Sequence, residues 1–591
     1  VGHVIEYRGQ AIRDLSMAPT TPNHRADPIG GPLVARLVAI SPLLLFVAVL
    51  LVSGSTRLFD RDETYYARAA VEMVESGDWL VPQFNGETFA HKPPLAYWLM
   101  AASMKAFGAS DLSVRLPSAI ALLATGLLTG LVARRLFDRE VGRWATAIFM
   151  GAAMPLIVGS SSMLDMLLVF FITLGAWAFV EQVIRPAAWR WAWIPMTVSM
   201  GGSMLCKFPV GPAVLLPMFL VAVLIGRREI WAGWRPLAGT LLATALGLIA
   251  FLAWAIPANR ATGGEMAQTG LMVHIVGRAL EPMEGHGGSG PLGYLLTLPV
   301  YVPIVIAGMF PWIIHLPAGC SALVRRHLGT PRSRAVLWAW IVPPFVMFSL
   351  AATKLPHYLL PVFPPLAILA AAALAAYREG RLSEKDRDWL RGGAFFQGVG
   401  ALLAATGLGL AGFAAAGVVE SLPALAAALL MAGVGVLAAI WQLRERIAEV
   451  NALLLVSTPM LVVVALVVGV GSIESLIKPG PEIAALVRAR ATPEMPVYAH
   501  GYREPGLLYY LGRPVGNPVR DLPKEPAAIA AWAGEASPAL LVTTADHLAA
   551  VERETGSLGL RAIGEVPIIH INKSGRRMRI LVLERSPIPP S

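Results

Sequence analysis

The sequence predicts an all-α polytopic membrane protein that carries an α/β domain at its C-terminus. Of its 591 residues, 56% are hydrophobic and only 15% are charged, a balance typical of chains that cross a membrane many times. About thirteen apolar stretches are long enough to span a bilayer as helices. After residue 474 the pattern changes to short β-branched runs separated by Pro and Gly, which is typical of strands and turns.

Three domains follow from this pattern. Residues 1–32 are polar and rich in Pro and Gly, and they predict a disordered cytoplasmic segment. Residues 33–474 form the transmembrane domain, and residues 475–591 form the α/β domain outside it. The expected spans lie near residues 34–54, 111–133, 142–159, 163–183, 190–205, 208–226, 236–257, 297–320, 334–352, 358–377, 392–415, 423–442 and 452–473.

The basic residues indicate which way the chain crosses the membrane. Arginine clusters fall at every second junction between apolar stretches, and such clusters mark cytoplasmic loops. The N-terminus is then cytoplasmic, and residues 57–98, the 258–296 loop and the C-terminal domain face outward. The clusters lie in residues 134–143, 185–190, 227–235, 325–334, 378–391 and 444–446.

Charge and cysteine content exclude two other classes of protein. The net charge of +10 does not indicate nucleic-acid binding, because most of the arginines lie in the short loops that set topology. The two cysteines, Cys206 and Cys320, both lie in apolar segments, which excludes a disulfide framework and a cysteine zinc site. No nucleotide-binding or hydrolase motif lies in a suitable strand–helix context.

The loop of residues 57–98 differs from everything around it, because acidic and basic residues crowd into it. Its middle predicts an amphipathic surface helix with Tyr65 and Met73 on one face, and Arg68 and Glu72 on the other. The pair Asp62-Glu63 begins this helix. Charged groups at the mouth of a membrane protein are candidates for chemistry.

Further ionisable groups stand at the outer ends of the apolar stretches. Several cations near one membrane face suit an anionic headgroup, and a phosphate on a lipid tail is the natural ligand. The outward-facing candidates are Asp62, Glu63, Lys92, Asp165, Lys207, Arg278, Glu281, Glu284, His286, Lys354, His357 and Tyr358.

Each candidate also has an ordinary structural interpretation. The Asp62-Glu63 pair suits the N-terminus of a helix, and Lys92 suits a side chain that reaches to lipid headgroups. Asp165 suits an ion pair with a neighbouring helix. His286 and His357 suit ordinary loop residues, since no second histidine stands at metal-ligand spacing.

Several motifs resemble one family. The segment DETYYARAAVEMVESGDWLVPQFNGETFAHKPPLAYW is similar to the first outer loop of the polyprenyl-phosphate-dependent GT-C glycosyltransferases. The resemblance is closest to the enzymes that transfer 4-amino-4-deoxy-L-arabinose to lipid A, and more distant to protein O-mannosyltransferases. It extends to SSSMLDMLLVFF, MLCKFPVGPAVLLP, HIVGRALEP, IAGMFPWIIHLP and KLPHYLLPVFPPLAIL.

This resemblance implies roles for individual residues. Asp62 and Glu63 would be the catalytic carboxylates, and Asp62 with His286 would be the ligands of a divalent metal, if one is used. The donor phosphate would be held by Lys92, Arg278, Lys354 and Tyr358. The cavity would be lined by Tyr66, Arg68, His91, Tyr97, Asp165 and Lys207.

The resemblance further implies an inverting transferase in the bacterial inner membrane with its active site facing the periplasm. The donor would be an undecaprenyl-phosphate-linked sugar, and the acceptor would be lipid A or another periplasmic glycan or lipid. One position departs from the family, whose aminoarabinose enzymes have Glu before the Lys-Pro that here follows His91. A galacturonosyl or mannosyl transferase acting on lipopolysaccharide, cell-wall glycan or protein is therefore the alternative. A lipid-linked-sugar transporter fits less well, because the charges gather at one face and not at the midplane.

Overall fold

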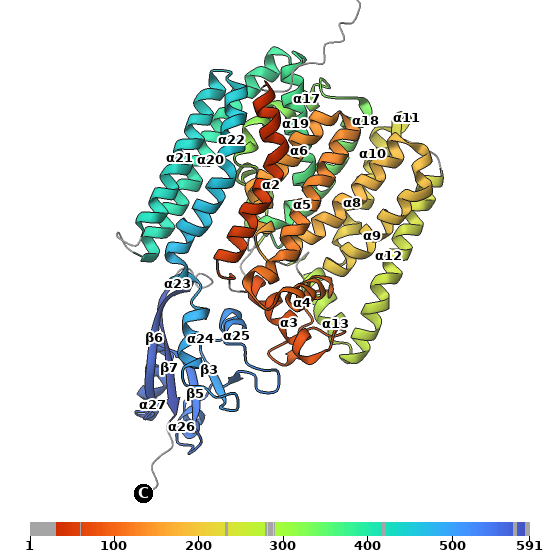
Figure 1. Cartoon of the computed structure of the whole chain (residues 1–591). Coiled ribbons are helices and arrows are strands. Elements are labelled where there is room, and N and C mark those ends of the chain that lie inside the picture. Colours follow the sequence, from red (N-terminus) through yellow and green to blue (C-terminus); the bar gives the residue numbers. More distant parts are fainter. Residues whose placement is uncertain are drawn as a thin grey trace, which may run out of the picture.

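The computed structural model describes residues 31–59, 61–230, 234–277, 280–281, 288, 290–416, 421–570 and 576–585. The chain forms a bundle of long helices with a sheet domain attached at one end (Figure 1). The expected disordered segment of residues 1–32 falls almost wholly outside the described residues. Its last two residues, Gly31 and Pro32, are the exception, because they already form the start of the first helix.

Ten helices in the described residues are long and apolar enough to cross a membrane, or eleven if the bent pair α6 (Arg139–Gly151) and α7 (Ala153–Gly159) is one span. The chain is therefore a multi-pass membrane protein, with fewer full-length spans than the thirteen expected. One reason is that α10 (Val210–Ile225) has only 16 residues. Another is that the stretch expected at 142–159 is bent by 63° between α6 and α7. The stretch expected at 297–320 is represented by the span Gly290–Gly308, which contains α16 (Tyr301–Gly308) and ends before α17 (Leu316–Val324).

Long helices make up most of the bundle, and short helical elements join them. The long helices are α2 (Gly31–Ser55), α5 (Asp111–Leu136), α8 (Leu164–Ile184), α9 (Trp189–Lys207), α12 (Trp234–Ala261), α18 (Pro331–Leu350), α19 (Phe363–Arg378), α20 (Glu384–Ala416), α21 (Leu422–Leu443) and α22 (Ile447–Val463). The short elements are α11 (Arg227–Ile230), α13 (Glu265–Ala267), η2 (Gln268–Gly277), α15 (Gly290–Thr297), η3 (Leu298–Val300), η4 (Trp312–His315), η5 (Pro356–Val362), η6 (Val464–Val470), η7 (Gly471–Ile473) and α23 (Glu474–Ile477).

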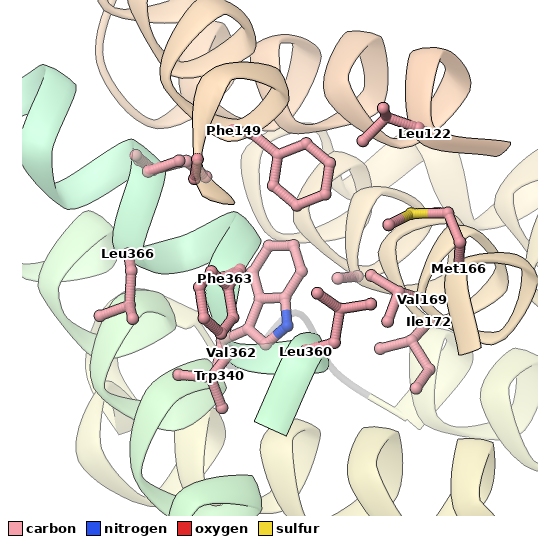
Figure 2. Close-up of a cluster of buried hydrophobic side chains, with 14 of the residues drawn as sticks. Leu122, Phe149, Met166, Val169, Ile172, Trp340, Leu360, Val362, Phe363 and Leu366 are labelled. Carbon is pink, nitrogen blue, oxygen red and sulfur yellow. The ribbon is translucent and has the colours of Figure 1, made fainter. Parts of the chain in front are cut away.

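The centre of the bundle is packed with aliphatic and aromatic side chains. Figure 2 shows Phe149, Met166, Trp340 and Phe363 converging from α6, α8, α18 and α19. All four side chains are fully removed from solvent. Large rings that interdigitate in this way fix the relative positions of the helices, because close-packed cores tolerate little displacement. This core therefore gives a rigid base to whatever site lies at the ends of α8 and α18.

Basic turns meet at the end of the bundle opposite the sheet domain. Arg378 on α19 forms an ion pair with Glu140 on α6, and Arg391 on α20 pairs with Glu445 at 2.6 Å. Asp386 accepts a hydrogen bond from Ser321 at 2.6 Å. These contacts connect turns that the sequence assigns to the same side of the membrane.

At the other end, a folded segment follows α2. It contains α3 (Asp62–Ser76), a two-stranded hairpin of β1 (Gln83–Phe84) and β2 (Glu87–Thr88), and α4 (Leu95–Phe107). The hairpin turns at Asn85 and Gly86, whose φ angles are 54° and 80°. Two residues with positive φ favour the Asn-Gly type of tight hairpin turn.

The C-terminal domain contains one five-stranded sheet in the order β4-β3-β5-β7-β6. The strand β3 is parallel to β4 and β5, while β7 is antiparallel to β5 and β6. The strands β6 and β7 are consecutive and pair antiparallel, and residues 571–575 between them lie outside the described residues. The elements are α24 (Gly480–Arg488), β3 (Val497–His500), α25 (Pro505–Leu511), β4 (Arg520–Asp521), α26 (Pro526–Ala533), β5 (Ala539–Thr544), α27 (Ala545–Thr555), β6 (Arg561–His570) and β7 (Arg576–Arg585).

Candidate active site

A cavity of about 260 Å³ opens where the hairpin segment meets the ends of several bundle helices. Its polar lining comprises His91, Lys92, Asp165, Lys207, His357 and Tyr358, and the rest is almost entirely apolar. Five of these six polar residues are among the site residues expected from the sequence. The apolar lining comes from α8, α10, η5 and the region around the end of α18. The cavity thus combines these six polar side chains, here called the charged group, with an apolar wall.

An ion pair between neighbouring helices lies at the centre of the polar lining. Lys207, the last residue of α9, places its Nζ 2.7 Å from Oδ1 of Asp165 in the first turn of α8. The side chains are 16% and 7% exposed. The other carboxylate oxygen of Asp165 lies 3.8 Å from Nε2 of His357. A buried ammonium without a counter-ion is costly, so Asp165 holds Lys207 in its charged form inside the cavity.

Tyr358 forms the opposite wall of this charged group. Lys207 Nζ lies 4.5 Å from the centre of the Tyr358 ring, within the range of a cation–π contact. The ring of His357 meets that of Tyr358 edge to face, with ring centres 5.2 Å apart. Both residues belong to η5, a 3-10 helix that begins at Pro356. The spacing of the histidines favoured an ordinary loop role for His357, so its place in the cavity is seen only in the fold.

The hairpin segment brings His91 and Lys92 to the cavity. The His91 ring lies 4.2 Å from the ring of Phe89, which stacks on Tyr65 of α3 at 5.4 Å. Phe84 of β1 completes the aromatic group, 4.7 Å from Tyr65. Lys92 lies in the turn before α4. Lys92 and Asp165 both line the cavity, so these two residues share one charged environment.

Asp62 begins α3 and is exposed. It is not part of the cavity lining, yet its negative charge acts on Lys207. Burial, and then the charge of Asp62, raise the pKa of the Tyr97 hydroxyl well above its usual value. Asp62 therefore lies at the edge of the charged group, on the side open to solvent.

Glu63 does not have the surroundings expected of a catalytic carboxylate. Only 3% exposed, it forms a two-pronged ion pair with Arg115 of α5, at 2.9 and 2.8 Å. It also accepts hydrogen bonds from the N–H groups of Phe59 and Ser162, at 2.8 and 2.7 Å. Burial raises the pKa of Glu63, but Arg115 and these hydrogen bonds outweigh burial and bring the pKa below its usual value. Glu63 thus joins α3 to the bundle and has no oxygen left for a substrate.

Lys354, expected at the donor phosphate, is not among the residues that line the cavity. Its ammonium donates to the carbonyl oxygens of Ser349 and Ala351, at 2.7 and 2.5 Å. These carbonyls belong to the C-terminal end of α18, where a helix favours positive charge. Burial lowers the pKa of Lys354. The structure gives this lysine the role of a helix cap.

Three further residues expected at the cavity also lie elsewhere in the fold. Tyr66 and Tyr97 are 7% and 0% exposed, and their rings pack 5.8 Å apart between α3 and α4. Arg68 is 1% exposed and lies beneath the C-terminal domain. The sequence pattern assigned Arg68 and Glu72 to a solvent face, but the domain that covers them begins some four hundred residues later. Arg278 and His286 lie outside the described residues.

The described residues contain no group of three His, Cys, Asp or Glu side chains arranged to hold a metal ion. The chemistry that the described arrangement supports is recognition of an anion. Lys92, Lys207 and Tyr358 offer N–H and O–H donors around one cavity, and a single carboxylate, Asp165, counters them. Such donors stabilise negative charge that develops on a leaving group more strongly than they would in water.

Comparison with known proteins finds a matching family model and a similar fold. Residues 91–256 match the family described as dolichyl-phosphate-mannose-protein mannosyltransferase. The crystal structure of ArnT from Cupriavidus metallidurans bound to undecaprenyl phosphate superimposes with a TM-score of 0.75. That match covers 94% of this chain and 99% of ArnT, at 22% sequence identity. The chain thus has the fold of ArnT.

The chain is also similar in sequence to curated transferases. It is 29% identical over 359 residues to the undecaprenyl phosphate-alpha-4-amino-4-deoxy-L-arabinose arabinosyl transferase 2 of Proteus mirabilis. It is 32% identical over 319 residues to the enzyme of that name in Sodalis glossinidius. These matches cover 59% and 53% of this chain, and 60% and 55% of the relatives. The chain thus spans less than two thirds of each relative's length.

Proposed function

We propose that the chain is an inverting glycosyltransferase that moves a sugar from an undecaprenyl-phosphate donor to an acceptor. The reaction takes place at the periplasmic face of the bacterial inner membrane, with the C-terminal domain in the periplasm. The leading specific reaction is transfer of 4-amino-4-deoxy-L-arabinose, the sugar in the names of the curated relatives. The acceptor is lipid A, which the sequence resemblance implies.

The observation that best supports this proposal is that the cavity has a charged side and an apolar side. A polyprenyl-phosphate sugar has a phosphate at one end of an apolar chain, and the cavity has Lys92 and Lys207 beside walls such as Val169 and Phe348. A soluble sugar nucleotide would need no apolar wall. A simple lipid-binding groove would need no buried ion pair such as Lys207–Asp165, which is expensive to maintain in a membrane.

The chemistry follows from where charge develops. As the bond between the anomeric carbon and the phosphate oxygen breaks, negative charge grows on the undecaprenyl phosphate that leaves. Lys92, with Lys207 beside it, stabilises this charge more in the transition state than in the bound donor. The acceptor oxygen attacks the anomeric carbon from the opposite face, and the configuration at that carbon inverts.

Asp62 has a role that depends on the acceptor. A hydroxyl acceptor must lose its proton as the new glycosidic bond forms, and Asp62 at the edge of the charged group takes it. A phosphate acceptor is already largely ionised and needs only to be positioned. The motivating observation is that Asp62 is exposed while its charge still reaches Lys207.

A second specific reaction is transfer of a galacturonosyl or mannosyl unit to lipopolysaccharide, cell-wall glycan or protein. The match of residues 91–256 to a protein mannosyltransferase family supports it. So does His91, which lines the cavity where an amino sugar would favour a carboxylate.

Mass spectrometry of lipid A and of the polyprenyl-phosphate pool, with and without this protein, tests the proposal. We expect an aminopentose on lipid A only when the protein is present, and accumulation of the lipid-linked sugar when it is absent. A hexuronic or hexose unit on another glycan would favour the second reaction. If neither pool changes, the chain is not the transferase proposed here.

A further inference from the structure

The helix α3 is fastened to the C-terminal domain as well as to the bundle. Arg68 and Glu72 on α3 are 1% and 0% exposed and form an ion pair at 2.5 Å. The second arm of the Arg68 guanidinium donates to the carbonyl oxygen of Arg513 in the C-terminal domain, at 2.7 Å. A hydrogen bond from a buried guanidinium to a backbone carbonyl fixes both groups in one geometry.

The same pair holds the hairpin. The Glu72 carboxylate accepts hydrogen bonds from the N–H groups of Asn85 and Gly86, at 2.6 and 3.0 Å. The Asn85 side chain in turn exchanges two hydrogen bonds with the backbone of Val519, at 2.9 and 3.1 Å. Both the helix and the hairpin turn are thus fixed to one loop of the C-terminal domain.

That loop is itself rigid. The Arg513 side chain, only 6% exposed, donates to the carbonyl oxygens of Thr492, Pro493 and Met495, at 2.9, 2.9 and 2.6 Å. The carbonyl that receives Arg68 therefore belongs to a residue whose side chain is also held. A flexible loop could not hold α3 in one orientation relative to the C-terminal domain.

Adhesion between the two parts does not need these charges. A buried ion pair loses much of its Coulombic attraction to desolvation, and apolar side chains of similar size often stabilise an interface as well or better. What Arg68, Glu72 and Asn85 add is one defined orientation of α3 and the hairpin against the C-terminal domain. A defined orientation matters most where reacting groups are held.

Both ends of this segment reach the charged group at the cavity. The helix α3 begins at Asp62, and the hairpin leads directly to His91 and Lys92. We propose that Arg68, Glu72 and Asn85 are positioning residues, through which the C-terminal domain sets the places of Asp62 and Lys92. This inference rests on the transferase function proposed above. It makes the C-terminal domain a part of the catalytic apparatus without a residue of its own at the reacting atoms.

The test uses the full-length protein in detergent or nanodiscs. Asn85→Gly removes both contacts with Val519 and keeps the turn, because Gly adopts positive φ readily. Arg68→Met removes the contact with Arg513 and keeps an unbranched chain of similar length. The matched control is Arg57→Gln, which breaks the more exposed ion pair between Arg57 and Glu482, at 2.5 Å. This pair also joins the chain to the C-terminal domain, but through the segment before α3 and not through α3 or the hairpin.

We expect kcat to fall about 10- to 100-fold in Asn85→Gly and Arg68→Met, since displacing reacting groups by about 1 Å has an effect of that size. KM for the donor should change much less, and Arg57→Gln should retain nearly all activity. Amide hydrogen exchange should rise in residues 62–76 and 83–92 of both variants but not of the control. Wild-type kcat in Asn85→Gly, or an equal loss in Arg57→Gln, would overturn the inference.

Hydrogen exchange separates this inference from the proposed function. If the wild-type protein transfers no sugar from any donor, the proposed function fails. The exchange measurement still decides whether the contacts of Arg68, Glu72 and Asn85 with the C-terminal domain, here called the clamp, hold α3 and the hairpin in place. Unchanged exchange in Asn85→Gly and in Arg68→Met would then refute the clamp by itself. If Arg68→Met does not fold, Asn85→Gly alone decides the question, because its turn conformation is preserved.

Discussion

At the residue scale, Asp62 and Glu63 are neighbours with opposite surroundings. Adjacent residues on a helix point in different directions, so one faces solvent and the other faces α5. The sequence predicts an acidic pair at the start of a helix, but it does not identify Arg115, 52 positions along the chain from Glu63, as the partner. That partner decides which carboxylate is available for chemistry.

We expect Glu63→Gln to destabilise the protein by about 3 kcal/mol or more, because it removes the ion-pair partner of the buried Arg115. Asp62→Asn should unfold at the wild-type temperature, and its turnover should fall about 10²- to 10⁴-fold if the acceptor is a hydroxyl. Thermal unfolding and kcat of the two purified variants test this pair. Equal stability of all three proteins would remove the structural role of Glu63.

The pKa of Glu63 gives a pH dependence of stability. Its folded-state pKa lies below the ordinary value of 4.5, so the ionised carboxylate contributes stability at neutral pH. This contribution begins to fall as the pH drops through about 4.5 and is lost below the folded-state pKa. We therefore expect the Tm of the wild type to fall more steeply than that of Glu63→Gln between pH 6 and pH 3. Parallel curves would contradict the assignment.

At the scale of elements, an ion pair joins the first turn of α8 to the last residue of α9. The sequence interpretation of Asp165 as the partner of a neighbouring helix is confirmed by its ion pair with Lys207. The same pair lines the cavity, so the structural and the functional interpretations both apply. Residue spacing does not reveal such a pair, because the two helices can pack in several registers.

Single and double substitutions separate the two roles of this pair. Asp165→Asn and Lys207→Met should each destabilise the protein by about 3–5 kcal/mol, because each removes one partner of a buried ion pair. The double variant should recover most of that stability and none of the transferase activity. Thermal unfolding and turnover are measured side by side. Recovery of activity in the double variant would show that the pair has only a structural role.

At the scale of the whole molecule, hydrophobic length and arginine positions predicted the class of fold, because both reflect the membrane directly. Contacts across long sequence separations were not predictable in this way. The pattern placed Arg68 on a solvent face, yet Arg68 is buried and donates a hydrogen bond to the carbonyl oxygen of Arg513, 445 residues along the chain. The family resemblance implied that Lys354 holds the donor phosphate, but in the fold Lys354 caps the C-terminal end of α18.

The topology gives a prediction at this scale. The basic turns meet at one end of the bundle, and α3 and the C-terminal domain lie at the other (Figure 1). From the positive-inside rule we predict that the C-terminal domain lies in the periplasm. A reporter enzyme fused to the C-terminus should be active only in a form that requires export. Activity of a cytoplasmic reporter there would reverse the orientation.

The central claim is that Lys92 serves the phosphate of a lipid-linked sugar, and turnover of purified protein with undecaprenyl-phosphate-linked aminoarabinose tests it most directly. We predict that Lys92→Ala lowers kcat about 10²- to 10³-fold, the loss typical of one donor to a developing anion. The matched control Lys354→Ala should stay within a few-fold of wild type, since that lysine caps α18 outside the cavity. Wild-type turnover in Lys92→Ala would contradict this role for Lys92.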